Sequence, residues 1–218
     1  MPEPVTLTGR WVTLEPLTAA KHTAALWSAV QGHDEVWTWL ADGPYSNEAG
    51  LAEAVEAKQS GLAAQFFAIL PGFHSEAAGY ASLMRIDAAN GAIEVGNVMF
   101  SPLLQRTPAA TEAMFLMARY VFEELGYRRY EWKCNALNLP SRRAAERLGF
   151  TFEGVFRQHM VVKGENRDTA WYSMLDSEWP ARKQAFETWL AAENFDGEGR
   201  QKCALGSLHG NPDEHEKP

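Results

Sequence analysis

The stretch that most constrains the fold reads EVGNVMFSPLLQRTPAATEA, from Glu94 to Ala113. It starts as a strand, because an apolar run with β-branched members is ended by a Ser-Pro pair. After a loop at Leu103–Thr107, apolar residues recur every three or four positions up to Leu125, which predicts a half-buried helix. Thr before Pro suits the start of this helix, and Gly126 suits its end.

A short loop that leads from a strand into a helix leaves backbone N–H groups unpaired at the positive end of the helix dipole. This geometry suits a phosphate group, and Arg106 adds a full positive charge. Many such units bind nothing, so the geometry alone indicates an anion site without establishing one.

The run Gln105-Arg106-Thr107-Pro108-Ala109-Ala110 resembles the acetyl-CoA pyrophosphate loop of the GCN5-related N-acetyltransferases (GNAT). That family's pattern is Gln or Arg, two variable residues, Gly, one variable residue, then Gly or Ala. The Ala-Thr-Glu-Ala that closes the run is similar to the RimJ/RimL-like branch. NLPSRRAAERLGF, from Asn138 to Phe150, resembles the family's second cofactor motif, Asn-x-x-Ser at the start of a short helix ending in Leu-Gly-Phe. The resemblance covers roughly Gly9 to Trp179.

The resemblance implies acetyl-CoA as cosubstrate, with its pantetheine arm along the end of the strand and its diphosphate at the loop. The cofactor-binding residues it indicates are Met99, Phe100, Gln105, Arg106, Thr107, Ala109, Ala110, Thr111, Asn138, Ser141 and Arg142. Pro108 stands where the family usually has Gly, so one backbone donor to the diphosphate is absent. Arg106 and Thr107 are the residues that would compensate.

Acetyl transfer to an amine needs a base, because only the uncharged amine is a nucleophile. Glu94 lies eleven residues before Gln105, a spacing similar to that of family members that use a strand glutamate as base. Strand alternation places Glu94 on the face of Gly96, Val98 and Phe100. The alternative, a solvated charge at a strand edge, stays open at this point.

Two other residues compete with Glu94 for the role of base. Glu131 lies on a neighbouring predicted strand, but an ion pair with Arg129 or Lys133 explains it more simply. His159, in a late strand, is the one histidine placed to act in the acceptor site.

The leaving thiolate needs a hydrogen-bond donor, which the resemblance assigns to Ser141. The alternative is that Ser141 only caps a helix, as Asn138 also can. Cys134 alternates with Trp132 on a face expected to be buried, so we interpret it as a core residue and not as a nucleophile.

The composition limits the class of protein. A chain of 218 residues with 46% hydrophobic content can bury one sizeable core. The formal charge of −8 argues against a nucleic-acid partner and mildly favours a cationic amine. No apolar stretch is long enough for a membrane span and the N-terminus lacks a signal-peptide pattern, so we expect a cytoplasmic protein that binds no membrane. Two cysteines and scattered histidines indicate neither a disulfide framework nor a metal site.

The order of elements predicts a mixed α/β fold with a central, mostly antiparallel sheet flanked by helices, as in the resembled family. We expect one domain over residues 1–192, ending in a helix at Ser177–Glu193. A polar tail over 193–218 follows, which is either mobile or docked on a partner subunit. The hairpin near the end should turn at Lys163–Asn166. Aromatic residues near the N-terminus either line the acceptor pocket or, as is commoner, belong to the core; they are Trp27, Trp37, Trp39 and Tyr45.

Two functions follow from these patterns. The first is an N-acetyltransferase that moves acetyl directly from acetyl-CoA to a primary amine, on a small molecule or a protein N-terminus. The second is a CoA-binding sensor or interaction protein that keeps the fold but little turnover, which the missing donor at Pro108 favours. A homodimer is compatible with either.

Overall fold

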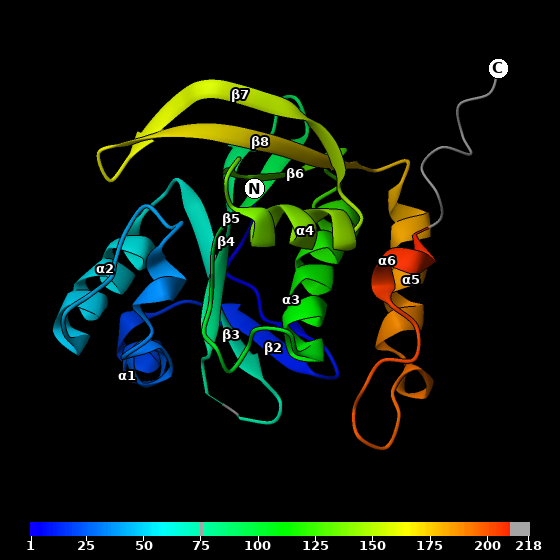
Figure 1. The fold of residues 1–218 in the computed structure, drawn as a ribbon, viewed down its shortest axis with the longest axis horizontal. Coiled ribbons are helices and arrows are strands. Elements are labelled where there is room, and N and C mark those ends of the chain that lie inside the picture. Colours follow the sequence, from blue (N-terminus) through cyan, green and yellow to red (C-terminus); the bar gives the residue numbers. More distant parts are fainter. Residues whose placement is uncertain (75, 210–218) are drawn as a thin grey trace.

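The computed structural model describes residues 1–74 and 76–209 (Figure 1). Its strands are β1 (Leu7–Thr8), β2 (Val12–Pro16), β3 (Ala64–Pro71), β4 (Gly79–Asp87), β5 (Ala92–Phe100), β6 (Arg129–Asn135), β7 (Thr151–Val162) and β8 (Glu165–Leu175). Its α-helices are α1 (Ala19–Val30), α2 (Glu48–Ser60), α3 (Pro108–Arg119), α4 (Leu139–Arg147), α5 (Trp179–Leu190) and α6 (Leu205–Leu208). Short turns of other helix types are η1 (Asp34–Trp37), η2 (Tyr120–Glu124) and η3 (Ala192–Asn194).

The strands form one sheet in the order β1-β2-β3-β4-β5-β6-β8-β7. Neighbouring strands are antiparallel except β5 and β6, which are parallel. The predicted mixed α/β fold is therefore confirmed. The last hairpin turns at Lys163-Gly164 and not over Lys163–Asn166, because positive φ angles of 51° and 83° let two residues close it.

Helices cover both faces of the sheet. Figure 1 shows α1 and α2 on one side, and α3 with α5 on the other. The first pair packs on the smaller apolar cluster, which contains Trp37, with Trp27 and Tyr45 against it. The core interpretation of these aromatic residues is therefore correct, whereas Trp39 is exposed.

Helix α3 lies on the larger apolar cluster and is tied to the start of the sheet by a buried carboxylate. Glu112 accepts hydrogen bonds of 2.5 to 3.0 Å from the backbone N–H groups of Arg10, Trp11 and Val12. A Cβ added at Gly9 would lie 2.4 Å from this carboxylate, so only glycine fits there. These contacts fix the helix that follows the candidate anion-binding loop.

Residues 193–209 pack on the body of the protein instead of projecting from it. The last long helix is α5, and beyond it Leu205 is fully buried among residues of the larger cluster. Phe195 packs against Trp11 and Trp189, with ring centroids 5.7 and 5.3 Å apart. The prediction of a mobile tail is thus wrong for residues 193–209, because a few apolar anchors dock a segment that has no periodicity. Residues 210–218 lie outside the described residues.

Within residues 1–74 and 76–209, no helix combines the length and the apolar character needed to span a membrane.

Candidate active site

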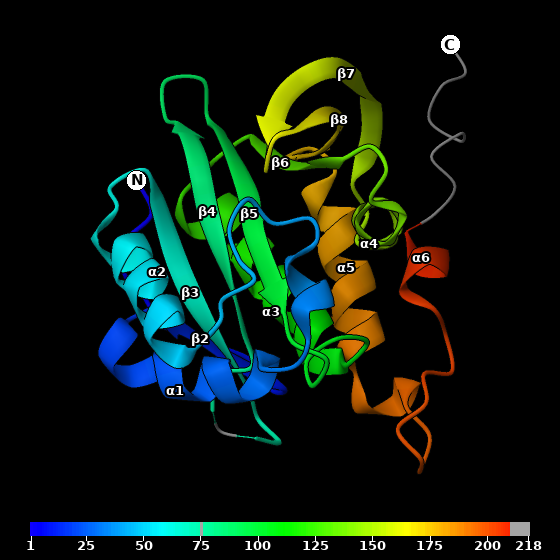
Figure 2. The same ribbon diagram turned by 60° about the vertical axis from the view of Figure 1, so that its left-hand side comes forward.

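The central strands separate at the middle of the sheet. Strands β5 and β6 pair only over residues 92–95 and 129–132, within the described part of the chain. Beyond these residues β6 continues beside β8, whereas β5 continues beside β4, and the strands diverge (Figure 2). The second half of β5 therefore has an edge without a neighbouring strand, with backbone groups available to an extended ligand.

The loop after β5 supplies the N-terminus of α3. Thr107 caps this helix, since its Oγ1 accepts from the Ala110 N–H at 3.2 Å and donates to the Leu104 carbonyl at 2.7 Å. Pro108 is the first helical residue, as predicted. In the described chain, the N–H groups of Arg106 and Ala109 have no partner. They remain as donors for an anion, despite the one lost at Pro108.

Four of the predicted cofactor residues, at the end of β5 and the start of α3, have buried side chains and can offer only backbone groups to a ligand. Met99 is fully buried, and Ala109, Ala110 and Thr111 are also buried. The Thr111 Oγ1 accepts a hydrogen bond of 3.1 Å from Arg147, which links α3 to α4.

Three other predicted residues differ in what their side chains do. Phe100 packs its side chain on the larger cluster. Gln105 Nε2 donates to the Phe100 carbonyl at 2.8 Å and so holds the loop against the strand. Arg106 is exposed with φ at 61°, and it alone in the loop presents a free charge.

Helix α4 begins at the second motif. The Asn138 side chain caps it by accepting from the Ser141 N–H at 3.1 Å. Ser141 is therefore not the cap; its Oγ accepts a hydrogen bond of 3.0 Å from Trp132 Nε1. The Ser141 hydroxyl keeps its own proton available to another acceptor. Cys134 is buried beside it, and burial raises the pKa of this thiol, which supports its interpretation as a core residue.

Arg142 is held by other side chains. Its Nε donates to the Tyr172 hydroxyl at 3.1 Å, and its guanidinium lies 5.4 Å from the centre of the Phe152 ring. The Tyr172 hydroxyl in turn donates to Glu146 at 3.1 Å. Arg142 is thus oriented at the N-terminal end of α4 before any ligand arrives.

A bulge in β5 changes which of its side chains share a face. Tyr80 pairs with Met99 but Ser82 pairs with Gly96, so Asn97 and Val98 together oppose one residue of β4. Asn97 has φ at 50°, and its Nδ2 donates to the Ser82 Oγ at 3.0 Å. Beyond the bulge the alternation is reversed. The prediction that Glu94 shares a face with Val98 and Phe100 is therefore wrong, since both pack on the α3 side.

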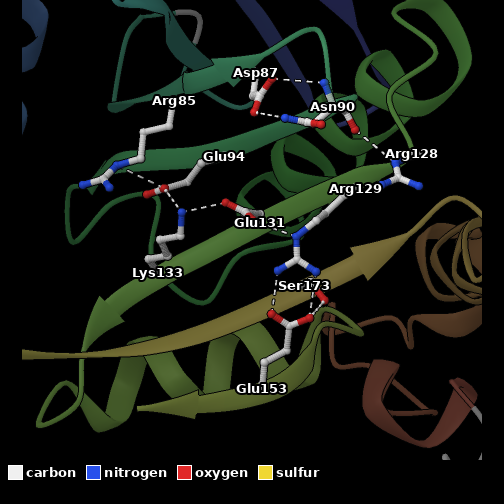
Figure 3. Close-up of polar contacts among 10 residues, drawn as sticks. All are labelled: Arg85, Asp87, Asn90, Glu94, Arg128, Arg129, Glu131, Lys133, Glu153 and Ser173. Carbon is white, nitrogen blue, oxygen red and sulfur yellow. Dashed lines mark hydrogen bonds and ion pairs between the residues drawn. The ribbon is translucent and has the colours of Figure 1, made fainter. Parts of the chain in front are cut away.

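Glu94 lies on the face opposite α3, at the point where β5 and β6 separate. It is only 4% exposed, so its interpretation as a solvated edge charge is wrong. Its Oε2 lies 3.0 Å from Lys133 Nζ and 3.3 Å from Arg85 Nε (Figure 3). Burial raises the pKa of Glu94, against the lowering effect of these two cations.

Glu131 is occupied by ion pairs. Lys133 Nζ and Arg129 Nε lie 2.6 and 2.7 Å from its carboxylate oxygens (Figure 3). Burial acts to raise the pKa of Glu131, but the bonds to Lys133 and Arg129 outweigh it and the pKa is lowered. The simpler explanation of Glu131 as an ion-pair partner is correct.

His159 hydrogen-bonds through Nδ1 to the Thr169 Oγ1 at 3.0 Å. Burial and the charges of Arg85, Arg167 and Lys133 lower its pKa, which favours the neutral ring. His159 therefore belongs to the same face as Glu94.

The two predicted catalytic side chains lie on opposite faces of the sheet. Ser141 contacts Trp132, whose face packs on α3, whereas Glu94 faces away from α3. Close to both groups, the pairing of β5 with β6 ends at Val95 and Trp132.

Sequence reasoning missed the residues that surround Glu94. The sequence patterns indicate Lys133 only as a partner of Glu131, and they do not point to Arg85, Asn97 or Arg167. A lysine two positions after a glutamate on one strand is a visible signal, because both side chains share a face. The backbone conformation of Asn97 has no comparable signal in the sequence.

A helix N-terminus with free N–H groups beside an unpaired strand edge, with a buried carboxylate on the opposite face of the sheet, is an arrangement that suits a CoA-dependent acyltransferase. Residues 12–151 match the family model described as "Acetyltransferase (GNAT) domain". The chain therefore belongs to the GNAT acetyltransferase family, whose members use acetyl-CoA.

Solved structures agree with this assignment. A GCN5-related N-acetyltransferase from Brucella melitensis is 52% identical with a TM-score of 0.93, and the match covers 95% of each chain. A structure from Chromobacterium violaceum, described as a probable acetyltransferase of the GNAT family, is 42% identical with a TM-score of 0.78 and covers 83% of this chain and 90% of that one.

A curated relative supports the RimJ/RimL-like branch. It is the Bacillus subtilis protein named "Putative ribosomal N-acetyltransferase YdaF", 32% identical over 105 residues, which are 48% of this chain and 57% of that protein. The chain spans about half the length of the curated relatives it matches.

Proposed function

We propose that this protein transfers an acetyl group from acetyl-CoA directly to a primary amine while both substrates are bound. The observation that carries the proposal is the gap between β5 and β6, with the anion-binding end of α3 and Ser141 on one face and Glu94 on the other. Direct transfer needs both substrates to meet at one point, and the gap provides it.

The residues present fit acetyl-CoA. The free N–H groups of Arg106 and Ala109, with the Arg106 charge, suit the diphosphate. The unpaired edge of β5 near Met99 and Phe100 suits the amides of the pantetheine arm, and Asn138, Ser141 and Arg142 lie at the start of α4. Acetyl-CoA supplies an activated acetyl thioester.

The reaction needs two proton movements. The carboxylate of Glu94 accepts a proton from the acceptor ammonium, directly or through water, and its raised pKa suits this role near neutrality. The amine nitrogen then bonds to the acetyl carbon as the carbon–sulfur bond breaks, and its surplus proton passes, through water or the Ser141 hydroxyl, to the leaving thiolate sulfur. The Ser141 hydroxyl donates to the leaving thiolate sulfur, while Trp132 holds its oxygen in place.

A protein N-terminus is the acceptor that we favour over a small amine. The support is the name of the Bacillus subtilis relative, which describes a ribosomal N-acetyltransferase.

The test is mass-spectrometric detection of acetylated product after incubation with acetyl-CoA and a panel of N-terminal peptides, polyamines and amino acids. Direct transfer predicts product together with an unmodified mass for the protein incubated with acetyl-CoA alone. Cys134→Ala should retain turnover, because the thiol is buried and takes no part. Tight acetyl-CoA binding with no product from any amine would instead support a CoA-binding sensor.

A further inference from the structure

The face that carries Glu94 also carries an aromatic cluster under the β7–β8 hairpin. The rings of Phe156 and Trp171 are 4.4 Å apart, and His159 lies 5.9 Å from Trp171. Lys133 Nζ is 3.8 Å from the centre of the Trp171 ring. Phe156 remains about half exposed, so the cluster forms one accessible side of the region next to Glu94.

The charged groups on this face do not balance. Lys133 lies between Glu94 and Glu131, and Arg85 lies 3.3 Å from Glu94. Arg129 is used by Glu131 and Glu153 (Figure 3). In these pairs Lys133, Arg85 and Arg129 are matched by Glu94, Glu131 and Glu153, and a fourth cation of the face, an arginine, takes no part.

That arginine is Arg167 on β8. No ion pair or side-chain hydrogen bond to it occurs among residues 1–74 and 76–209, and its Nε is shielded from solvent without a partner. Arg85 Nη2 lies 3.9 Å from the Sδ of Met160, the β7 residue that pairs with Arg167, so the two arginines lie near each other. Burial lowers the pKa of Arg167, while Cys134 and Glu94 oppose this effect and Arg85 adds to it. A half-buried guanidinium without an anion is costly, which indicates that a partner arrives with the substrate.

Irregular backbone places both arginines. Arg85 has φ at 47°, where the pairing of β4 with β5 shifts between Met84 and Asp87. Arg167 pairs with Met160 just after a second shift, which contains Gln158 with φ at 50°. Bulges of this kind redirect side chains and occur next to active sites.

We propose that Arg167, with Arg85 beside it, binds a carboxylate of the acceptor, so that the acceptor carries a carboxylate close to its reactive amine. This inference rests on the proposed acetyl transfer. Glu94 takes the ammonium group and Arg167 takes the carboxylate, and a planar guanidinium can bind a carboxylate through two parallel hydrogen bonds. The Phe156–Trp171 side packs on the apolar part of the acceptor.

Matched acceptor pairs test this proposal. One pair is a peptide with Asp or Asn at its second position, and the other is a free amino acid or its amide. In at least one pair, we expect kcat/KM to be roughly tenfold or more higher for the acid than for its amide. A charge-assisted hydrogen bond supplies a free-energy difference of this size. Preference within the peptide pair indicates a protein acceptor, and preference within the other indicates a small molecule.

Arg167→Gln should remove this preference by lowering kcat/KM for the acid alone, and Arg167→Lys should keep part of it. The control is Arg157→Gln, an exposed arginine on the same hairpin that faces the charge of Asp168. Equal kcat/KM within both pairs, or equal behaviour of the Arg167→Gln and Arg157→Gln variants, would overturn the proposal.

If no amine is acetylated, the proposed function is wrong, but a binding experiment still tests whether Arg167 binds a carboxylate. Calorimetric titration of the same pairs into the protein with CoA should then show tighter binding of the acid, lost in Arg167→Gln. Equal binding of acid and amide would reject the site.

Discussion

At the scale of single residues, the chemistry depends on how Glu94 is held. Burial favours its protonated form, while Lys133 and Arg85 favour the carboxylate, and the balance raises its pKa above the ordinary value. Glu131 lies directly opposite Glu94 on the neighbouring strand β6 and also contacts Lys133, yet the pKa of Glu131 is lowered. The two glutamates thus differ in basicity because Glu94 is more deeply buried and because the cations lie closer to Glu131.

The pH dependence of acetyl transfer should therefore follow Glu94. Activity that needs its carboxylate rises as pH increases through the raised pKa. Glu94→Gln should depress turnover at pH 7 and recover part of the loss at higher pH, where more of the amine is already neutral. Initial rates across the pH range measure this.

Glu131→Gln is the control for that experiment, since an amide oxygen still accepts from Lys133, and it should behave like the parent protein. A Glu94→Gln protein with the parental pH profile would remove Glu94 from the mechanism and leave water, Glu131 or His159 as the base.

Ser141→Ala should lower turnover by roughly 10²-fold or less and leave acetyl-CoA affinity nearly unchanged, because the hydroxyl acts on the leaving thiolate. Trp132→Phe is the matched variant: it removes the 3.0 Å hydrogen bond to Ser141 but keeps the hydroxyl, so its loss should be smaller. A loss of affinity without a loss of turnover in Ser141→Ala would assign Ser141 to binding only.

At the scale of elements, the decisive unit is β5 with the loop and helix that follow it. The end of the strand and the start of the helix lie where the Ser-Pro pair and the Thr cap predict. The α-helix itself ends at Arg119 and continues as a π-helix over Tyr120–Glu124, so only the whole helical segment extends toward the predicted stop at Gly126. The bulge at Asn97 reverses the faces in between, so a regular strand would have placed Met99 away from the α1–α2 side where it packs.

Arg106→Glu should weaken acetyl-CoA binding roughly tenfold or more, because it replaces a positive charge beside the diphosphate with a negative one. Calorimetry on the folded variant measures this, with Arg157→Glu as a charge-matched control away from the loop. Unchanged affinity in Arg106→Glu would place the diphosphate elsewhere.

At the scale of the whole molecule, the C-terminal segment supports the helices that hold the site. Arg182 Nη1 donates to the His209 carbonyl at 2.9 Å, and His209 Nε2 donates to the carbonyl of Arg147 at the end of α4 at 3.0 Å. Arg147 also reaches Thr111 on α3. The C-terminal segment thus stabilises α3 and α4, the two helices whose N-termini carry the predicted cofactor residues.

Leu205→Ala should destabilise the fold by about 2–5 kcal/mol, as for other fully buried leucines, and lower the melting temperature by several degrees. Thermal unfolding measures this. Leu62→Ala is the control, because Leu62 is 97% exposed and should change nothing. Equal melting temperatures for the two variants would show that the segment does not dock in solution.

The sequence by itself determined the elements and the family. Helix periodicity, turn residues and caps act within a few positions of the chain. The sequence therefore predicts strands at Ala92–Phe100, Arg129–Asn135 and Thr151–Val162, which are the bounds of β5, β6 and β7, and the two cofactor motifs are contiguous runs. The pairing of β5 with β6, the bulge at Asn97, the burial of Glu94 between cations and the docking of Leu205 join residues far apart in the chain. Only the tertiary structure decided these features, because each depends on which distant residue lies opposite and no local pattern records that.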